Sequence, residues 1–199
     1  MDITDGPALL FPDGRLAYLP FEALISPGDS VPWGAGRSVR YAPSASVLLA
    51  LAEAPPVRAQ QGVLAVGDPA RTPGDPLPSL PHAADEARQI YHLFDPAHST
   101  LLLGAGATRA RLRALDPGRY RYLHFALHAL VSDQRPERTA LVLADGRLDL
   151  PAIRALDLDA DLVTLSACET ALGHRLRGEG VIGLPYAFCF VNSPQISSA

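Results

Sequence analysis

The feature that most constrains this chain is an alternation of short apolar runs with helical segments. Four apolar runs have the length of a strand, at 62–69, 100–104, 121–128 and 160–168. Helical patterns separate them, at 82–94, 107–115 and 150–156. Continuous apolar runs that end in turn residues are typical of strands buried on both faces. Strands that alternate with helices form right-handed βαβ units, so we expect an α/β protein with a mostly parallel central sheet and helices on both faces.

The remaining segments of the chain predict further helices, strands and loops. Two apolar runs flank Pro12-Asp13-Gly14 within 8–24, which predicts an N-terminal hairpin. A loop rich in Gly, Pro and Ser follows over 26–43, and a helix is expected over 43–54, with Ser44 or Ser46 as its N-cap. Further elements are a strand over 139–146 and a helix over 178–191.

Composition narrows the classes of function. With 199 residues and 48% hydrophobic residues, we expect a single globular domain over 1–199. A net charge of −4 gives no electrostatic reason to expect a nucleic-acid partner. The first ten residues lack the pattern of a signal peptide and no apolar run reaches the roughly 18 residues of a membrane span. The two cysteines make no disulfide framework, so the sequence favours a cytoplasmic protein with reduced thiols and no membrane contact.

Two reactive side chains end predicted strands, and ligands in open parallel sheets gather at the carboxyl ends of strands. His128 ends the 121–128 run and Cys168 ends the 160–168 run. Neighbouring parallel strands lie about 4.8 Å apart. If the two strands are adjacent, or nearly so, a Cys–His pair follows, in which the imidazole stabilises the thiolate and later protonates a leaving amine.

Other interpretations of these residues are structural or belong to other enzyme classes. A lone cysteine or histidine on a strand is usually part of a core, and we expect His124 to be structural, with its ring nitrogens hydrogen-bonded to backbone or to a neighbouring loop. His124 and His128 lie about 13 Å apart on a strand, at roughly 3.3 Å per residue, which is too far for one zinc ion with Cys168. A glutamine amidotransferase is also disfavoured, because its nucleophile elbow has small flanking residues whereas Glu169 follows Cys168.

Three segments in order carry a family resemblance. They are "YLHFALHA" at 122–129, "LVTLSACETALG" at 162–173 and "GEGVIGLPYAF" at 178–188. Together with upstream segments such as "FPDGRLAYLPFEAL" and "GATRARLRAL", they resemble the CHAT domain over about 8–190. The CHAT domain is a module of the caspase-like and separase-like cysteine peptidases.

The resemblance implies a caspase-like three-layer sandwich in which Cys168 is the nucleophile and His128 the general base or acid. It further implies an oxyanion hole formed by the backbone N–H groups of Cys168 and Ala129. The family usually has glycine after this histidine, and alanine would adopt a positive φ only at a cost of order 1 kcal/mol.

The expected function is therefore that of a cysteine endopeptidase, with a protein or peptide substrate and neither a cofactor nor a metal. After Phe188 the chain departs from the family pattern, with a divergent tail over 191–199, which resembles a domain truncated at its C-terminus. The alternative is a catalytically inactive caspase-like module that binds a regulatory protein partner. The sequence does not determine the oligomeric state.

Overall fold

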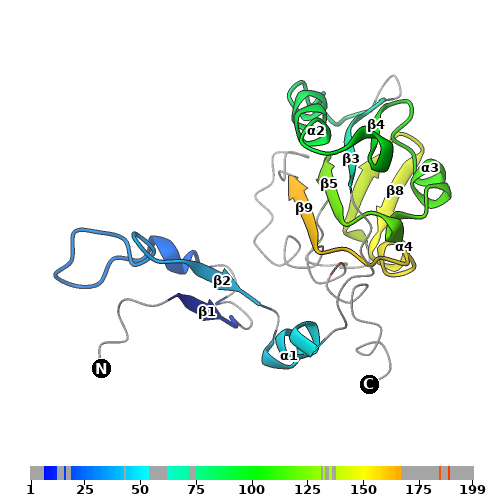
Figure 1. Ribbon diagram of the computed structural model, residues 1–199. Coiled ribbons are helices and arrows are strands. Elements are labelled where there is room, and N and C mark those ends of the chain that lie inside the picture. The colour runs from blue at the N-terminus through cyan, green and yellow to red at the C-terminus, as the bar shows by residue number, and fades with distance from the viewer. Residues whose placement is uncertain are drawn as a thin grey trace.

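A four-stranded parallel sheet forms the centre of the molecule in the computed structural model (Figure 1). The structure describes residues 7–12, 16, 19–42, 44–53, 62–71, 75–130, 132, 135, 138–166, 184 and 188. The sheet has the order β4-β3-β5-β9. Its strands are β3 (Val63–Pro69), β4 (Thr100–Gly104), β5 (Tyr122–Ala126) and β9 (Leu162–Ser166). The predicted α/β class with a mostly parallel sheet is confirmed.

One face of this sheet is covered by α2 (Ala83–Tyr91). The helix lies close because small residues meet at the contact: a Cβ added to Gly67 of β3 would lie 2.6 Å from the Ala83 carbonyl oxygen and 2.8 Å from the Ala87 Cβ. Ala87 is fully buried. A glycine in β3 and an alanine in α2 thus set the distance between helix and sheet.

The opposite face packs on a second sheet, on α3 (Arg109–Ala114) and on α4 (Leu150–Arg154), which lie beside β8 in Figure 1. This antiparallel sheet contains β6 (Ala129–Leu130), β7 (Ala140–Leu143) and β8 (Gly146–Asp149). Side chains of both layers share one core, which includes Leu64, Val66, Leu102, Leu112, Phe125, Leu141, Leu148 and Ile153. The helices therefore cover both faces of the parallel sheet.

Two predicted strand boundaries are corrected by this second sheet. The strand predicted over 121–128 ends at Ala126, and Ala129 begins β6. The segment predicted as one strand over 139–146 is the first arm of a hairpin, because β7 turns at Ala144-Asp145 and returns as β8. Gly146, with φ of 126°, adopts the backbone conformation that this tight turn needs.

The predicted N-terminal hairpin is wrong in its pairing. β1 (Ala8–Leu10) pairs in parallel with β2 (Val39–Tyr41), and Phe21–Ala23 form a short 3-10 helix, η2, instead of a returning strand. Tyr41 of β2 binds this 3-10 helix: its hydroxyl donates to the Glu22 carboxylate and accepts from the Phe21 N–H at 3.2 Å. A partner strand whose paired residues lie 31 positions later gives no signal in the local turn pattern.

The helix that follows β2 agrees with its prediction. α1 (Ala45–Glu53) begins after Ser44, whose Oγ accepts from the Val47 N–H at 3.2 Å. Ser44 is thus one of the two predicted N-caps. Of the helix predicted over 178–191, the described residues Leu184 and Phe188 are helical and buried, and Phe188 packs on Phe125 with ring centroids 5.6 Å apart.

Candidate functional site

Two neighbouring strands, β5 and β9, end in register at the carboxyl edge of the parallel sheet, and β3 lies on the other side of β5. Gly67 of β3 pairs with Ala126 of β5, and Ala126 pairs with Ser166 of β9. The strand that leads to His128 and the strand that leads to Cys168 are therefore direct neighbours, as a Cys–His pair requires. His128 and Cys168 each follow their paired residue by two positions along the chain. Cys168 itself lies outside the described residues.

His128 is buried just beyond the end of β5, with 2% of its surface exposed. Its Nε2 lies 2.7 Å from the carbonyl oxygen of Pro78, in the loop between β3 and α2. A carbonyl oxygen only accepts hydrogen bonds, so Nε2 carries the proton and donates it. In the neutral ring Nδ1 is then the basic nitrogen. The loop thus selects the tautomer of His128 through a backbone carbonyl group.

The loop that carries Pro78 is tied together by one carboxylate. Asp75 accepts from the Leu77 N–H at 3.0 Å and forms an ion pair with Arg71, whose Nη2 lies 2.6 Å from Asp75 Oδ2. The pKa of Asp75 is lowered, chiefly by the Leu77 N–H and then by Arg71, with a smaller contribution from the nearby His128. The carboxylate stays ionised and negative beside the histidine.

Ala129 follows the histidine and is the first residue of β6. The Val142 N–H donates to the His128 carbonyl oxygen at 2.9 Å, so Ala129 and Leu141 form a non-hydrogen-bonded pair of the antiparallel ladder. The N–H of Ala129 therefore points away from β7. Among the described residues other than glycine, only Asp68 and Asp116 have positive φ. Alanine therefore occupies this position without the cost of a positive φ that its replacement of the family's glycine suggested.

His124 lies in β5 on the face toward α2 and is separate from this edge. It is 5% exposed, and its Nε2 lies 3.1 Å from Glu86 Oε1 without the alignment of a hydrogen bond. Burial lowers the pKa of His124, and the Glu86 carboxylate partly opposes that shift. The buried placement agrees with the expectation that His124 is structural. The expected hydrogen bond to backbone or to a neighbouring loop is wrong for Nε2, which faces a carboxylate of the covering helix.

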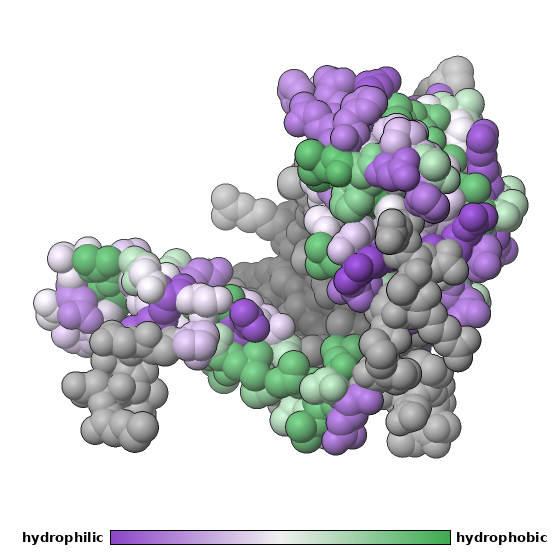
Figure 2. Space-filling model, viewed as in Figure 1, coloured by the Kyte–Doolittle hydropathy of each residue, from purple (hydrophilic) through white to green (hydrophobic). Residues whose placement is uncertain are grey.

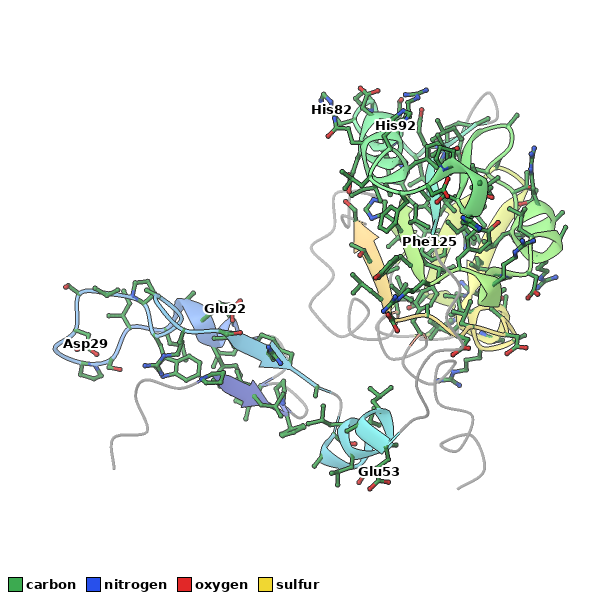
Figure 3. The ribbon with its side chains drawn as sticks, viewed as in Figure 1. Glu22, Asp29, Glu53, His82, His92 and Phe125 are labelled. Carbon is green, nitrogen blue, oxygen red and sulfur yellow. The ribbon has the colours of Figure 1, made fainter. Side chains whose placement is uncertain are left out.

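The other histidines, acidic groups and the pocket that the described residues form lack the features of a catalytic or metal site. His82 and His92 lie exposed at the two ends of α2, far from the core residue Phe125 (Figure 3). No group of three or more His, Cys, Asp or Glu side chains within the described ranges has the arrangement of a metal site. A pocket of about 380 Å³ near β1 is lined there by Leu10, Phe21, Leu24, Ile25, Ser26 and Trp33. No side chain of that lining titrates near neutral pH.

Exposed apolar side chains concentrate around the same N-terminal segment. Leu9, Phe11, Leu24 and Ile25 are each more than 40% exposed. Figure 2 shows hydrophobic residues in green on the surface of the described part of the molecule. Within the described residues, no helix is both long and apolar enough to cross a membrane.

The contribution of the 69–81 loop was not identified from sequence. Five prolines mark this segment as a loop, but proline spacing does not indicate which carbonyl turns toward a histidine 50 residues later. The only sequence signal was the position of the loop, which follows a parallel strand at the edge where sites form.

Comparison with known families assigns almost the whole chain. The CHAT domain matches residues 3–191 of the 199. No curated protein matches the sequence. With the parallel sheet, the buried His128 at its carboxyl edge and the adjacent strand that leads to Cys168, this match shows that the chain belongs to the CHAT domain family, a caspase-like family related to peptidases.

Proposed function

We propose that this protein is a cysteine endopeptidase in which Cys168 is the nucleophile and His128 the general base. The observation that carries the proposal is the 2.7 Å hydrogen bond from His128 Nε2 to the Pro78 carbonyl oxygen, at the sheet edge where the neighbouring strand continues to Cys168. This bond leaves Nδ1 as the nitrogen that exchanges protons.

The reaction needs few further groups. Nδ1 of His128 takes the proton of the Cys168 thiol, and the sulfur attacks the carbonyl carbon of the scissile peptide bond. The resulting oxyanion accepts hydrogen bonds from the N–H groups of Ala129 and Cys168. As the C–N bond breaks, the imidazolium returns its proton to the leaving amine. Water then gives its proton to Nδ1, attacks the thioester, and releases the acid and the free thiol.

Two observations on described residues support these assignments. The Ala129 N–H is not used in the ladder with β7, which is what a donor to an oxyanion requires. Ser166, two residues before Cys168 in the sequence, ends the strand that neighbours β5. Because the chemistry needs a reduced thiol, we place the protein in a reducing compartment such as the cytoplasm.

A peptide library and a thiol-directed activity probe test the proposal together. The wild-type chain and the Cys189→Ala variant should cleave library peptides and take up the probe, whereas Cys168→Ala should do neither. Equal labelling of both cysteine variants would refute the assignment of Cys168.

The main alternative is a caspase-like interaction module without turnover. It gains support if the full chain binds a protein partner but cleaves no peptide, and if His128→Gln leaves that binding unchanged. Ala129 has no positive φ, so the alanine in place of the family's glycine does not favour this alternative.

A further inference from the structure

The loop between β3 and α2 contains a connected set of polar contacts that ends on His128. Ala70 is fixed to the end of β4, because its N–H donates to the Gly104 carbonyl oxygen at 2.9 Å. The next residue, Arg71, forms the ion pair with Asp75. The other oxygen of Asp75 holds the Leu77 N–H, one residue before Pro78. The contacts therefore connect the end of β4 with the Pro78 carbonyl that binds His128.

This ion pair differs from an ordinary surface pair. The side chains of Arg71 and Asp75 are only 17% and 24% exposed. Arg71 Nε and Nη2 are buried and make no aligned hydrogen bond, so the Asp75 carboxylate supplies the compensating charge for this guanidinium. Removing one partner of such a pair leaves a charge that is partly shielded from water. The 75–78 turn is then no longer held by the ion pair, and the remaining charge has no partner of opposite sign.

We propose that Asp75 and Arg71 are positioning residues for His128: their ion pair fixes the 75–78 turn, which holds the Pro78 carbonyl against Nε2. The role rests on the proposed function, since it matters for catalysis only if His128 is the general base. Neither residue touches the reacting atoms. Their effect is on the tautomer and the orientation of the ring.

The direct test is the tautomer of His128, which does not depend on turnover. The full chain carrying Cys168→Ala is labelled with 15N-histidine, His128 is assigned with His128→Gln, and long-range 1H–15N spectra give the ratio of the Nε2–H to the Nδ1–H form. We expect the Nε2–H form to dominate. Asp75→Asn should lower the ratio about fivefold, as expected when the hydrogen bond from Nε2 of His128 to the Pro78 carbonyl oxygen is lost.

The chain offers a matched control for the removed charge. Asp85 of α2 forms an ion pair with Arg88 at 3.0 Å, and both side chains are exposed. Asp85→Asn should leave the ratio unchanged. An unchanged ratio in a folded Asp75→Asn variant would overturn the proposal.

If Asp75→Asn does not fold, the Arg71 variants decide. Arg71→Gln removes the ion pair and should lower the ratio, whereas Arg71→Lys keeps the charge and should restore most of it. A wild-type ratio in Arg71→Gln would overturn the proposal. If the ratio responds as expected but no variant with Cys168 hydrolyses peptides, the endopeptidase proposal fails and the positioning role stands. In an active protein, Asp75→Asn should lower kcat more than it changes KM.

Discussion

Two buried histidines four residues apart occupy two different regions of the same segment. His124 lies within β5, under α2, and faces the carboxylate of Glu86. His128 lies past the end of β5, at the carboxyl edge of the sheet, and faces the backbone carbonyl of Pro78. Both have 5% or less of their surface exposed. Burial therefore does not distinguish a structural histidine from a candidate base, but the partner and the position in the sheet do.

The hydrogen-bonding or ionic partner of each histidine determines which protonated form of its ring is favoured. A carboxylate favours the charged ring, and under α2 it only partly offsets the burial that lowers the pKa of His124. A carbonyl oxygen selects which nitrogen carries the proton of the neutral ring, and in that ring the other nitrogen is an acceptor. The first arrangement makes stability depend on pH, and the second prepares a proton acceptor.

The largest expected difference between the two regions is in hydrolysis. His128→Gln should lower kcat/KM by about 10²–10⁴-fold, because general acid–base catalysis contributes in that range. His124→Gln should change kcat/KM by less than about threefold, since its ring has no access to the reacting atoms. Steady-state kinetics on the best library peptide measures both. Similar losses in the two variants would break the comparison.

The next effect concerns the contact between helix and sheet that covers His124. Gly67→Ala would place a Cβ 2.6 Å from the Ala83 carbonyl oxygen, so α2 must move outward. We expect the free energy of unfolding to fall by about 1–3 kcal/mol, as for overpacking in a core. Urea unfolding followed by circular dichroism measures it.

A glycine in looser surroundings provides the control for that variant. The Cβ of Gly106→Ala would lie 3.2 Å from the Leu103 carbonyl oxygen, which requires a smaller adjustment. An equal or smaller loss in Gly67→Ala than in Gly106→Ala would show that the spacing of α2 is not set at this contact.

A smaller effect is expected from Glu86, and only at mildly acidic pH. Because the pKa of His124 in the folded protein is below its ordinary value of 6.5, the unfolded chain binds more protons below that pH, and stability falls as the pH drops. Glu86→Gln removes the charge that limits this shift, so the loss between pH 7 and pH 5 should be steeper, by about 0.5 kcal/mol for a partly exposed pair. Thermal unfolding across this range measures the slope. A slope that stays the same in Glu86→Gln, or one that survives in His124→Gln, would contradict this origin.

The smallest effect is expected at Ala129. Its backbone has no positive φ, so Ala129→Gly should not raise kcat/KM and should cost at most about 1 kcal/mol of stability through the flexibility of glycine. Paired kinetic and unfolding measurements check this. A marked gain in activity would show that alanine strains the oxyanion site.

Sequence patterns predicted the parallel sheet well because its strands are short buried runs bounded by turns. β4 has the predicted bounds of 100–104, and β3 begins one residue later than predicted. The adjacency of β5 and β9, on which the candidate pair depends, was left conditional because strand order is a property of the whole chain.

The features that sequence missed depend on distant partners. β1 pairs with β2 at a separation of 31 positions, and β6 is only two residues long, too short for a period to be visible. The Asp145-Gly146 dipeptide did contain a hairpin signal for β7 and β8, which the prediction of a single strand did not use. The Pro78 carbonyl carries no side-chain chemistry, so composition does not reveal its contact with His128.

The rate of alkylation of Cys168 by iodoacetamide tests the central claim most directly. It is measured in the Cys189→Ala background, with and without His128→Gln, at pH 6.5 and pH 9.5. An isolated thiol is only about 1% ionised at pH 6.5 and largely ionised at pH 9.5. If His128 activates Cys168, the His128→Gln change should slow alkylation at least about tenfold at pH 6.5 and little at pH 9.5. Equal rates at pH 6.5 with and without His128 would contradict the account.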